Sequence, residues 1–316
     1  MGLLENGIWR DKPRIPGKKG EFNRIAAQLR NWITADSSTP YTPDSGRYHL
    51  YVSYACPWAH RTLIFRKLKG LENHIGFSVV SPLMMENGWE FTEWPGATAD
   101  TVNGVNYMHQ IYTLNRKDYS GRCSVPVLWD KQTGGIVSNE SSEIIRMLNS
   151  AFNGLTDNTD DYYPEDLRGE IDAVNERVYE TVNNGVYRSG FAQSQEAYED
   201  AVTALFDTLD WLEERLSTHR YLAGDRITEA DWRLFPTLIR FDHVYHGHFK
   251  CNIRRLVDYP NLFAYTRELY QWPGIAETVN MDHIRWHYYY SHPWVNPSRV
   301  VSKGPEIDFD APHGRT

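Results

Sequence analysis

The sequence contains very little cysteine. Only Cys56, Cys123 and Cys251 occur among its 316 residues. Their odd number and wide spacing fit neither a disulfide framework nor a structural zinc site, because both need cysteines in pairs or clusters. Each cysteine therefore needs its own explanation.

Long apolar runs and basic clusters are lacking as well. No stretch approaches the roughly 20 apolar residues of a membrane-spanning helix. The opening segment, MGLLENGIWRDKPRIPGKKG, has no apolar core and no cleavage site of a secretory signal. We therefore predict a cytoplasmic protein. The net charge is -8, with Lys and Arg dispersed, which argues against nucleic acid and membrane partners and favours small molecules.

Aromatic residues are abundant by contrast. They make up 14% of the chain, with 11 Trp and 20 Tyr. This content suits a ligand cavity walled by rings, and it equally suits large aromatic cores.

The length suffices for two domains, and the pattern changes near the middle of the chain. A polar segment, NGLTDNTDDYYPED, is typical of a linker between them. We predict an N-terminal extension, an α/β domain, an all-helical domain and an irregular aromatic tail, over residues 1–45, 46–155, 165–285 and 286–316. Within the extension, the amphipathic stretch FNRIAAQLRNWI predicts one helix.

The α/β domain begins with a strand in RYHLYVSY, a helix from Pro57 to about Lys69, and a second strand in HIGFSVVSP. This order predicts a βαβ unit with parallel strands. SVPVLWD and GGIVS predict a hairpin, and NESSEIIRMLN predicts the helix after it. The intervening insert, residues 83–124, contains one further candidate helix in VNYMHQIYTLNR.

The helical domain contains one clear helix start, in RITEADWRLF. Thr228 is in the N-cap position and Asp231 follows three residues later, which is the spacing of a capping box. Ile227 and Trp232 have the spacing of a hydrophobic staple.

Cys56 has the position of a reactive cysteine, because it lies between a predicted strand and a predicted helix that opens with Pro57. The free N–H groups and dipole of a helix N-terminus favour a thiolate, so we expect a lowered pKa for Cys56. A buried structural cysteine is the alternative.

A dithiol redox motif would place a second cysteine three residues later, but Ala59 stands there. A mixed disulfide on Cys56 must therefore wait for an outside thiol, of which glutathione is the commonest in cells. Cys123 is a second candidate for resolving it, although the lack of a helix N-terminus favours a structural role. Cys251 carries no functional signal.

These features resemble a known family. Cys56-Pro57-Trp58-Ala59 after a strand, Val125-Pro126 before another and Asn139-Glu140-Ser141 before a helix are similar to the thioredoxin-like half of a glutathione transferase, and the TEAD capping box is similar to its helical half. The resemblance narrows to the xi class, the glutathionyl-hydroquinone reductases, through SYACPWAHRTLIFRKLKGLE, NGWEF, SVPVLWD, IVSNESSEIIRMLN, TVNNGVYRSGFAQSQEAY and MDHIRWHYYYSH.

The resemblance implies a role for each matching residue. Cys56 would be the nucleophile, and Tyr187 and Tyr288 would contact a phenolic substrate beside it. The implied glutathione site consists of Trp89 over the tripeptide, Arg122 at its glycine carboxylate, Val125 with a cis Pro126 at its cysteinyl backbone, and Glu140 with Ser141 at its γ-glutamyl group. An ordinary surface arginine is the alternative for Arg122, and a helix cap is a compatible role for Ser141.

The implied activity is glutathione-dependent reduction of glutathionyl-hydroquinones by a homodimer. Glutathione is then a co-substrate, and no metal or nucleotide is required. The alternatives are an omega-like thioltransferase or dehydroascorbate reductase, and a non-catalytic ligand-binding protein on the same scaffold. Histidines recur in FDHVYHGHF and at His283 and His287, but their spacing places no third metal ligand and lacks the Glu of a HExxH site.

Overall fold

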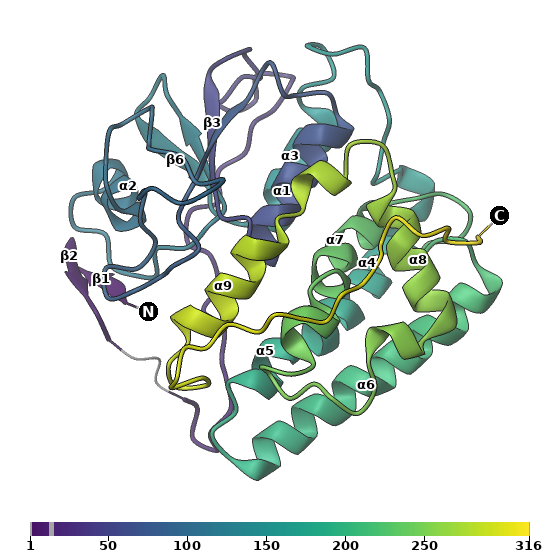
Figure 1. Ribbon diagram of the computed structural model, residues 1–316. Helices are drawn as coiled ribbons and strands as arrows, with labels where there is room; N and C mark the ends of the chain where they lie inside the picture. The colour runs from purple at the N-terminus through teal and green to yellow at the C-terminus, as the bar shows by residue number, and fades with distance from the viewer. Residues whose placement is uncertain (1, 13–15, 316) are drawn as a thin grey trace. The chain divides into compact units, whose positions relative to one another are not determined.

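The computed structural model describes residues 2–12 and 16–315, which form two compact units (Figure 1). Of these residues, the first unit holds 2–12, 25–160 and 278–287, and the second holds 16–24, 161–277 and 288–315. Each unit is therefore discontinuous in sequence. The predicted domain boundaries assume continuous segments, and they stay a prediction.

A four-stranded sheet forms the centre of the first unit. Its strands are β3 (Tyr48–Val52), β4 (Gly76–Val79), β5 (Val127–Asp130) and β6 (Gly135–Ser138), in the order β4-β3-β5-β6. β3 and β4 pair in parallel, whereas β5 pairs antiparallel with both β3 and β6. The predicted parallel βαβ unit and the predicted hairpin are both confirmed.

Helices cover both faces of this sheet. α1 (Pro57–Leu68) connects β3 to β4, and it packs against α3 (Ser141–Ser150), which follows β6. α2 (Met108–Asn115) lies in the insert and contacts β6. Figure 1 shows the sheet between α2 and the pair formed by α1 and α3. This is the thioredoxin-like arrangement that the resemblance implies.

The prediction of a helix in FNRIAAQLRNWI is wrong. Residues 22–33 contain no helix, and Arg30 instead forms an antiparallel bridge with Ser138 at the end of β6. The N–H of Asn31 donates to Val137 O over 2.9 Å, and the N–H of Asn139 donates to Leu29 O over 2.9 Å. A 12-residue helix is marginal by itself, and pairing with an open sheet edge satisfies the same backbone groups.

The N-terminal residues form a hairpin that the sequence analysis did not predict. β1 (Leu3–Glu5) pairs antiparallel with β2 (Ile8–Arg10). Asn6 and Gly7 join the strands with φ values of 48° and 78°. Asn-Gly is the preferred dipeptide of such turns, so the signal was present in the sequence.

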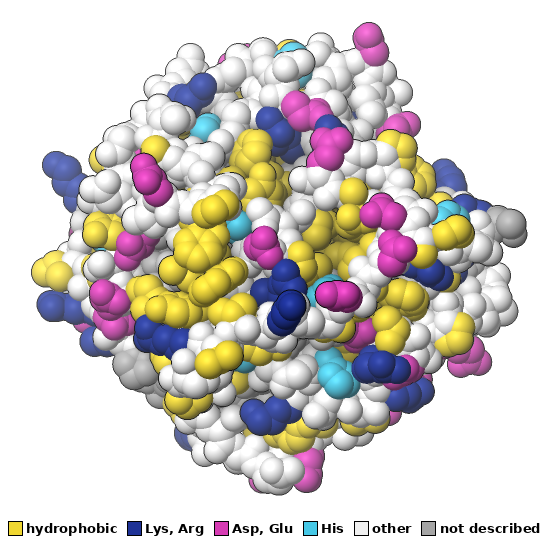
Figure 2. Space-filling view, viewed as in Figure 1, with side chains coloured by type: hydrophobic (Ala, Val, Ile, Leu, Met, Phe, Trp, Pro, Cys, Tyr) yellow, Lys and Arg dark blue, Asp and Glu magenta, His cyan; other side chains and the backbone are white. Residues whose placement is uncertain are grey.

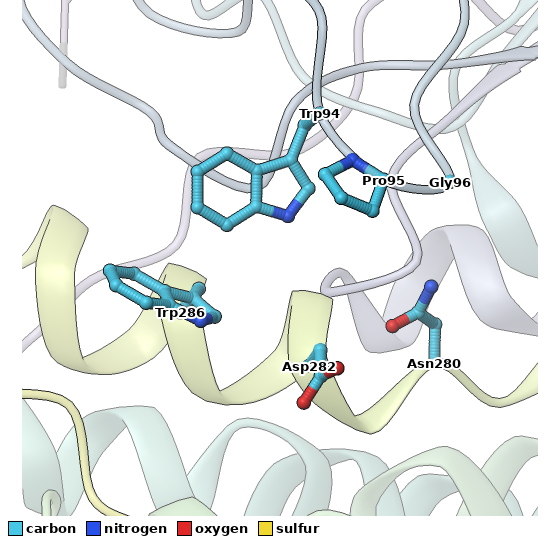
Figure 3. Close-up of a pocket in the computed structure, with 6 residues that line it drawn as sticks. All are labelled: Trp94, Pro95, Gly96, Asn280, Asp282 and Trp286. Atoms are coloured by element: carbon cyan, nitrogen blue, oxygen red, sulfur yellow. The ribbon is translucent and has the colours of Figure 1, made fainter.

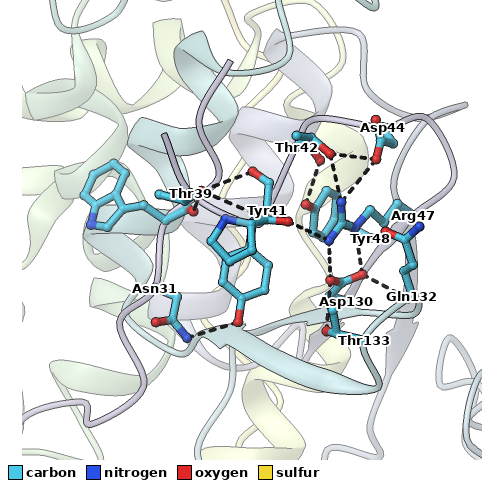
Figure 4. Close-up of polar contacts among 12 residues, drawn as sticks. Asn31, Thr39, Tyr41, Thr42, Asp44, Arg47, Tyr48, Asp130, Gln132 and Thr133 are labelled. Carbon is cyan, nitrogen blue, oxygen red and sulfur yellow. Dashed lines mark hydrogen bonds and ion pairs between the residues drawn. The ribbon is translucent and has the colours of Figure 1, made fainter. Parts of the chain in front are cut away.

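A buried ion pair fixes the entry into β3 (Figure 4). Arg47 donates to both oxygens of Asp130, from Nε over 2.9 Å and from Nη2 over 2.7 Å. The Arg47 side chain is 7% exposed and that of Asp130 is 0% exposed. Arg47 Nη1 also donates to Thr42 Oγ1 over 2.9 Å, and Tyr48 Oη donates to Thr42 O over 2.7 Å. These bonds attach the segment before β3 to the end of β5, and thereby position the strand that leads to Cys56.

His49 on β3 makes folding depend on pH. Its ring is buried and hydrogen-bonded to Ser78, with Nε2 and Oγ 2.9 Å apart. Burial lowers the pKa of His49 from 6.5 to about 4. The unfolded chain therefore takes up this proton more readily, so the free energy of unfolding falls as the pH decreases from 6.5 toward 4.

We expect this group to account for a loss of about 3 kcal/mol over that interval. Urea unfolding at a series of pH values, compared between the wild type and His49→Gln, measures it. The wild type should lose stability more steeply than the variant between pH 6.5 and 4. Parallel curves for the two proteins would show that His49 does not titrate as described.

The described part of the second unit is helical, as predicted. Its main helices are α4 (Arg168–Val178), α5 (Gly185–Gly190), α6 (Gln195–Thr218), α7 (Glu229–Leu238) and α8 (Pro260–Tyr270). Two π-helical turns, η2 (Tyr179–Asn183) and η3 (Phe241–Tyr245), follow α4 and α7. Short 3₁₀ turns lie at Glu165–Leu167, Leu256–Asp258 and Ala276–Thr278.

The predicted capping box at the start of α7 is confirmed. Asp231 Oδ2 accepts from the N–H of Thr228 over 2.7 Å, and the Thr228 side chain caps the N–H of Asp231. The other carboxylate oxygen, Oδ1, accepts from Leu222 N over 2.9 Å and from Tyr265 Oη over 2.7 Å. The cap therefore also connects α7 with α8 and with the segment before it.

The prediction that the tail is irregular is wrong over its first residues, because a helix extends into it. This helix is α9 (Met281–Ser291), and it carries residues of both units. Its sequence, MDHIRWHYYYS, has few aliphatic residues at helical spacing, so its periodicity was missed. The predicted aromatic tail, residues 286–316, accordingly begins inside a helix.

No helix within the described residues is long and apolar enough to cross a bilayer. On the face drawn in Figure 2, Lys and Arg side chains are scattered among Asp and Glu and form no continuous basic patch.

Candidate functional site

Cys56 lies at the junction of strand and helix. It is the N-cap residue of α1, with φ -78° and ψ 119°, and Pro57 is the first helical residue. Its carbonyl accepts from His60 N over 3.0 Å, which begins the helical hydrogen bonds. The sulfur does not cap the helix, and it donates to Val125 O over 3.5 Å. The thiol is therefore partly exposed at a helix N-terminus and in contact with one backbone carbonyl.

The segment at Val125 contains the cis peptide bond that the resemblance implies. The Val125–Pro126 peptide bond is cis, and β5 begins at the next residue. Tyr112 of α2 fixes the preceding residue, because its hydroxyl donates to Ser124 O over 2.9 Å. The structure therefore brings together Cys56 and Val125, which are far apart in the sequence.

Glu140 and Ser141 lie at the start of α3. Glu140 is the N-cap residue, and its Oε1 accepts from Ser142 N over 3.0 Å and from Ser142 Oγ over 2.7 Å. Ser141 is the first helical residue and is 3% exposed. The helix cap is therefore the side chain of Glu140, and not that of Ser141 as the sequence suggested. A helix N-terminus with the hydroxyl of Ser141 suits a carboxylate ligand, because the helix dipole favours negative charge there.

Arg122 and Trp89 are both held by other parts of the first unit. Arg122 Nη1 donates to Gly2 O over 3.0 Å, and burial lowers the pKa of this guanidinium. Trp89 is 8% exposed, and its ring stacks on His287 with the ring centroids 4.6 Å apart. Neither residue is a simple surface side chain.

Tyr187 and Tyr288 meet in the second unit. Their hydroxyl oxygens are 2.5 Å apart, and the Tyr288 hydroxyl is also 2.9 Å from that of Tyr245. Burial raises the pKa of Tyr245 and of Tyr288 well above the usual value of 10. Tyr187 is the partly exposed end of this chain of three hydroxyls, and Arg24 lies 5.0 Å from the centre of its ring.

Tyr245 is a third member of this group that was not among the predicted site residues. It ends the π-helical turn η3, and both Tyr245 and Tyr288 are buried, 0% and 1% exposed. Such π-helical turns occur often at functional sites, but a turn of this kind leaves no clear pattern in the sequence.

The other two cysteines have different environments. Burial raises the pKa of the Cys123 thiol far above its usual value, and raises that of Cys251 to about 12. Both side chains therefore stay protonated near neutral pH, which suits packing and not nucleophilic attack.

The histidines of α9 bind backbone groups. His283 Nε2 donates to Pro95 O over 2.8 Å, and His287 Nδ1 donates to Pro82 O over 2.9 Å. Among residues 2–12 and 16–315, no three His, Cys, Asp or Glu side chains are grouped so that they could hold a metal ion.

A cavity of about 400 Å³ lies in the first unit between the insert and the start of α9 (Figure 3). Trp94 and Trp286 form two of its walls, with ring centroids 5.2 Å apart and an interplanar angle of 67°. Pro95, Gly96, Asn280 and Asp282 complete the lining. None of the predicted site residues lines this cavity.

Both halves of the chain match models of one family. Residues 55–151 match the glutathione S-transferase N-terminal domain, and residues 195–268 match the glutathione S-transferase C-terminal domain.

Curated relatives match over nearly their full length. The chain is 54% identical over 323 residues to glutathionyl-hydroquinone reductase YqjG of Escherichia coli (strain K12), covering 100% of this chain and 98% of that protein. It is 53% identical over 306 residues to glutathionyl-hydroquinone reductase PcpF of Sphingobium chlorophenolicum, with 96% of each chain covered.

Solved structures of glutathione transferases are also similar to this chain. The glutathione-bound structure of YqjG from Escherichia coli K-12 has a TM-score of 0.92 at 53% identity and covers 99% of both chains. The Xi class transferase of Natrialba magadii has a TM-score of 0.94 at 51% identity, covering 100% of this chain and 96% of that one. The chain therefore belongs to the glutathione transferase family, and within it to the Xi class.

Proposed function

We propose that this protein is a glutathionyl-hydroquinone reductase, which converts a glutathionyl-hydroquinone and glutathione into the hydroquinone and glutathione disulfide. The observation that carries the proposal is the thiol of Cys56 at the N-terminus of α1, 3.5 Å from Val125 O. YqjG and PcpF, which share more than half of their residues with this chain, carry the name of that activity. YqjG has also been solved with glutathione bound.

Glutathione would bind beside Cys56 and Val125. The backbone of Val125, before the cis Pro126, would pair with the cysteinyl backbone of the tripeptide. Ser141 and the N–H groups at the start of α3 would take the γ-glutamyl carboxylate, while Glu140 would accept from its amino group. Trp89 would cover the tripeptide and Arg122 would bind the glycine carboxylate.

The first step cleaves the carbon–sulfur bond of the substrate. The thiolate of Cys56 attacks the glutathione sulfur, a disulfide forms, and the electron pair of the broken bond stays on the ring carbon. That carbon must gain a proton, which yields the hydroquinone. When the thiol of Cys56 ionises, it no longer donates to Val125 O, so this backbone becomes available to the tripeptide.

The second step regenerates the enzyme. A second glutathione attacks the mixed disulfide, forms glutathione disulfide and releases the thiolate of Cys56. The chain has Ala59 where a resolving cysteine would stand, and the raised pKa of Cys123 argues against Cys123 as a substitute. The resolving thiol is therefore external.

The tyrosines supply the proton for the ring carbon. Tyr187 is the partly exposed member of the three hydroxyls, so it would touch the substrate and donate first. Tyr288 lies behind it, bonded to both Tyr187 and Tyr245, and can pass a proton back to Tyr187. Since burial keeps Tyr245 and Tyr288 protonated, both hydroxyls still hold a proton to pass on at neutral pH.

We further propose that the enzyme is a cytoplasmic homodimer. The three free cysteines and the reliance on glutathione support this compartment, because thiols stay reduced where glutathione is abundant. Membership of the glutathione transferase family supports the dimer.

The direct test is to incubate the purified protein with glutathione and glutathionyl-menadiol, and to follow the free hydroquinone and glutathione disulfide. We expect the two products in equal amounts. Turnover of dehydroascorbate without hydroquinone release would instead assign the protein to omega-like thiol chemistry, and no turnover of either substrate would favour a ligand-binding protein.

A further inference from the structure

Trp89 directly follows a tight turn in the insert. The turn runs from Met85 to Gly88, with Gly88 N donating to Met85 O over 3.0 Å and Gly88 at φ +77°. Behind the turn, the carbonyl of Trp89 accepts from Met108 N over 2.9 Å. These bonds fix the backbone, but they leave the torsion angles of the indole side chain open.

His287 of α9 fixes one face of that indole. The two rings are stacked, with centroids 4.6 Å apart and planes 22° from parallel. The hydrogen bond from Nδ1 to Pro82 O, 2.9 Å long, sets the orientation of the imidazole. Since His287 is only 7% exposed, it has little freedom to turn away. The indole of Trp89 therefore rests on a ring that is itself held in place.

Trp9 of β2 holds the turn from another side. Its Nε1 donates to Glu86 O over 2.9 Å, inside the turn. Its ring lies so close to Gly88 that an added Cβ there would be 2.9 Å from Cη2 of Trp9. The ring of Trp9 also stacks on that of His109, with the ring centroids 4.7 Å apart.

The hairpin that carries Trp9 is in turn fastened to the body of the first unit. Leu4 and Gly121 exchange two backbone hydrogen bonds of 2.9 Å each. Gly7 N donates to Tyr119 O over 3.0 Å. The position of Trp9 is therefore determined by the unit and does not depend on the hairpin alone.

We propose that Trp9 and His287 are positioning residues, which together hold Trp89 in the orientation that binds glutathione. This inference rests on the proposed function, in which Trp89 covers the bound glutathione. It makes the N-terminal hairpin and α9 parts of the glutathione site, although neither contributes a residue that contacts the tripeptide in the proposal.

We call the contacts of Trp9 and His287 that hold Trp89 the clamp. A double-mutant cycle on the full-length protein tests it, with glutathione binding measured by isothermal titration calorimetry. His287→Ala and Trp9→Leu should each weaken binding by about fivefold to tenfold. In a Trp89→Leu background, the same two changes should have no further effect. His287→Phe, which keeps a ring on the indole, should recover most of the affinity.

His283→Ala is the matched control, because His283 lies one helical turn away and, like His287, bonds to a backbone carbonyl of the first unit. It should leave glutathione affinity within about twofold, since it does not stack on Trp89. Gly88→Ala is a second probe of the clamp, because its new Cβ would displace Trp9. It should weaken binding as Trp9→Leu does.

Equal losses with and without Trp89 would overturn the clamp, and so would unchanged affinity in the single variants. The measurement involves no hydroquinone, so these outcomes leave the proposed reaction standing. Failure of the wild type to bind glutathione would contradict the proposed function and also the role of the clamp.

Discussion

Replacement of Cys56 by Ser should lower kcat/KM for a glutathionyl-hydroquinone by at least about 10³-fold. The alkoxide of serine is far less accessible than a thiolate, and an oxygen at this position cannot form the mixed disulfide. The backbone of the site should be unchanged, because a serine hydroxyl can also donate to Val125 O, as Sγ does over 3.5 Å. Glutathione binding, measured by calorimetry, should therefore persist in Cys56→Ser.

Two further cysteine variants complete this test. Cys123→Ala and Cys251→Ala should retain activity within about twofold where they are folded, because burial raises the pKa of both thiols and neither is a nucleophile. Intact mass spectrometry after treatment with glutathione disulfide should show one glutathionyl group on the wild type and none on Cys56→Ser. Substantial activity in Cys56→Ser would contradict the proposed mechanism.

Replacement of Tyr187 by Phe should lower kcat for hydroquinone release by about 10²-fold, which is the usual contribution of a general acid. The ring and its packing on Phe191 and Phe249 stay in place, while the hydroxyl bonded to Tyr288 is lost. The second step needs no proton on carbon. Tyr187→Phe should therefore reduce a simple mixed disulfide, such as that of glutathione and mercaptoethanol, at nearly the wild-type rate.

Tyr289→Phe provides the matched control. Tyr289 is the neighbour of Tyr288 on α9, and its hydroxyl donates to His243 O over 3.3 Å, outside the chain of three hydroxyls. Its removal should change both rates by less than about twofold. Parallel losses of both activities in Tyr187→Phe would indicate a structural role, and no loss of either would assign the proton to another group.

The features predicted correctly are those with a local signal. Pro57 after an alternating strand placed α1 and therefore Cys56, because proline favours the first turn of a helix. The Thr228 and Asp231 spacing placed the start of α7 for a similar reason. In both cases the residues that determine the structure lie within a few positions of one another.

The features missed depend on distant partners. The amphipathic stretch around Arg30 became extended because the edge of β6, more than a hundred residues away, offered backbone groups to pair with. Tyr245 joined the two predicted tyrosines only because a π-helical turn and α9 place their hydroxyls together. The stacking of Trp89 on His287 is of the same kind.

Both steps of the proposed reaction need Cys56 to be ionised near neutral pH by the N-terminus of α1. The most direct measurement is the rate of iodoacetamide alkylation of Cys56 as a function of pH, followed by peptide mass spectrometry in the native protein. Cys123 and Cys251, whose pKa values are raised by burial, should stay unmodified and serve as internal references. We predict a midpoint for Cys56 clearly below the value of about 8.5 for a free thiol. A midpoint at or above that value would show that the helix N-terminus does not ionise Cys56, and would contradict the proposed mechanism.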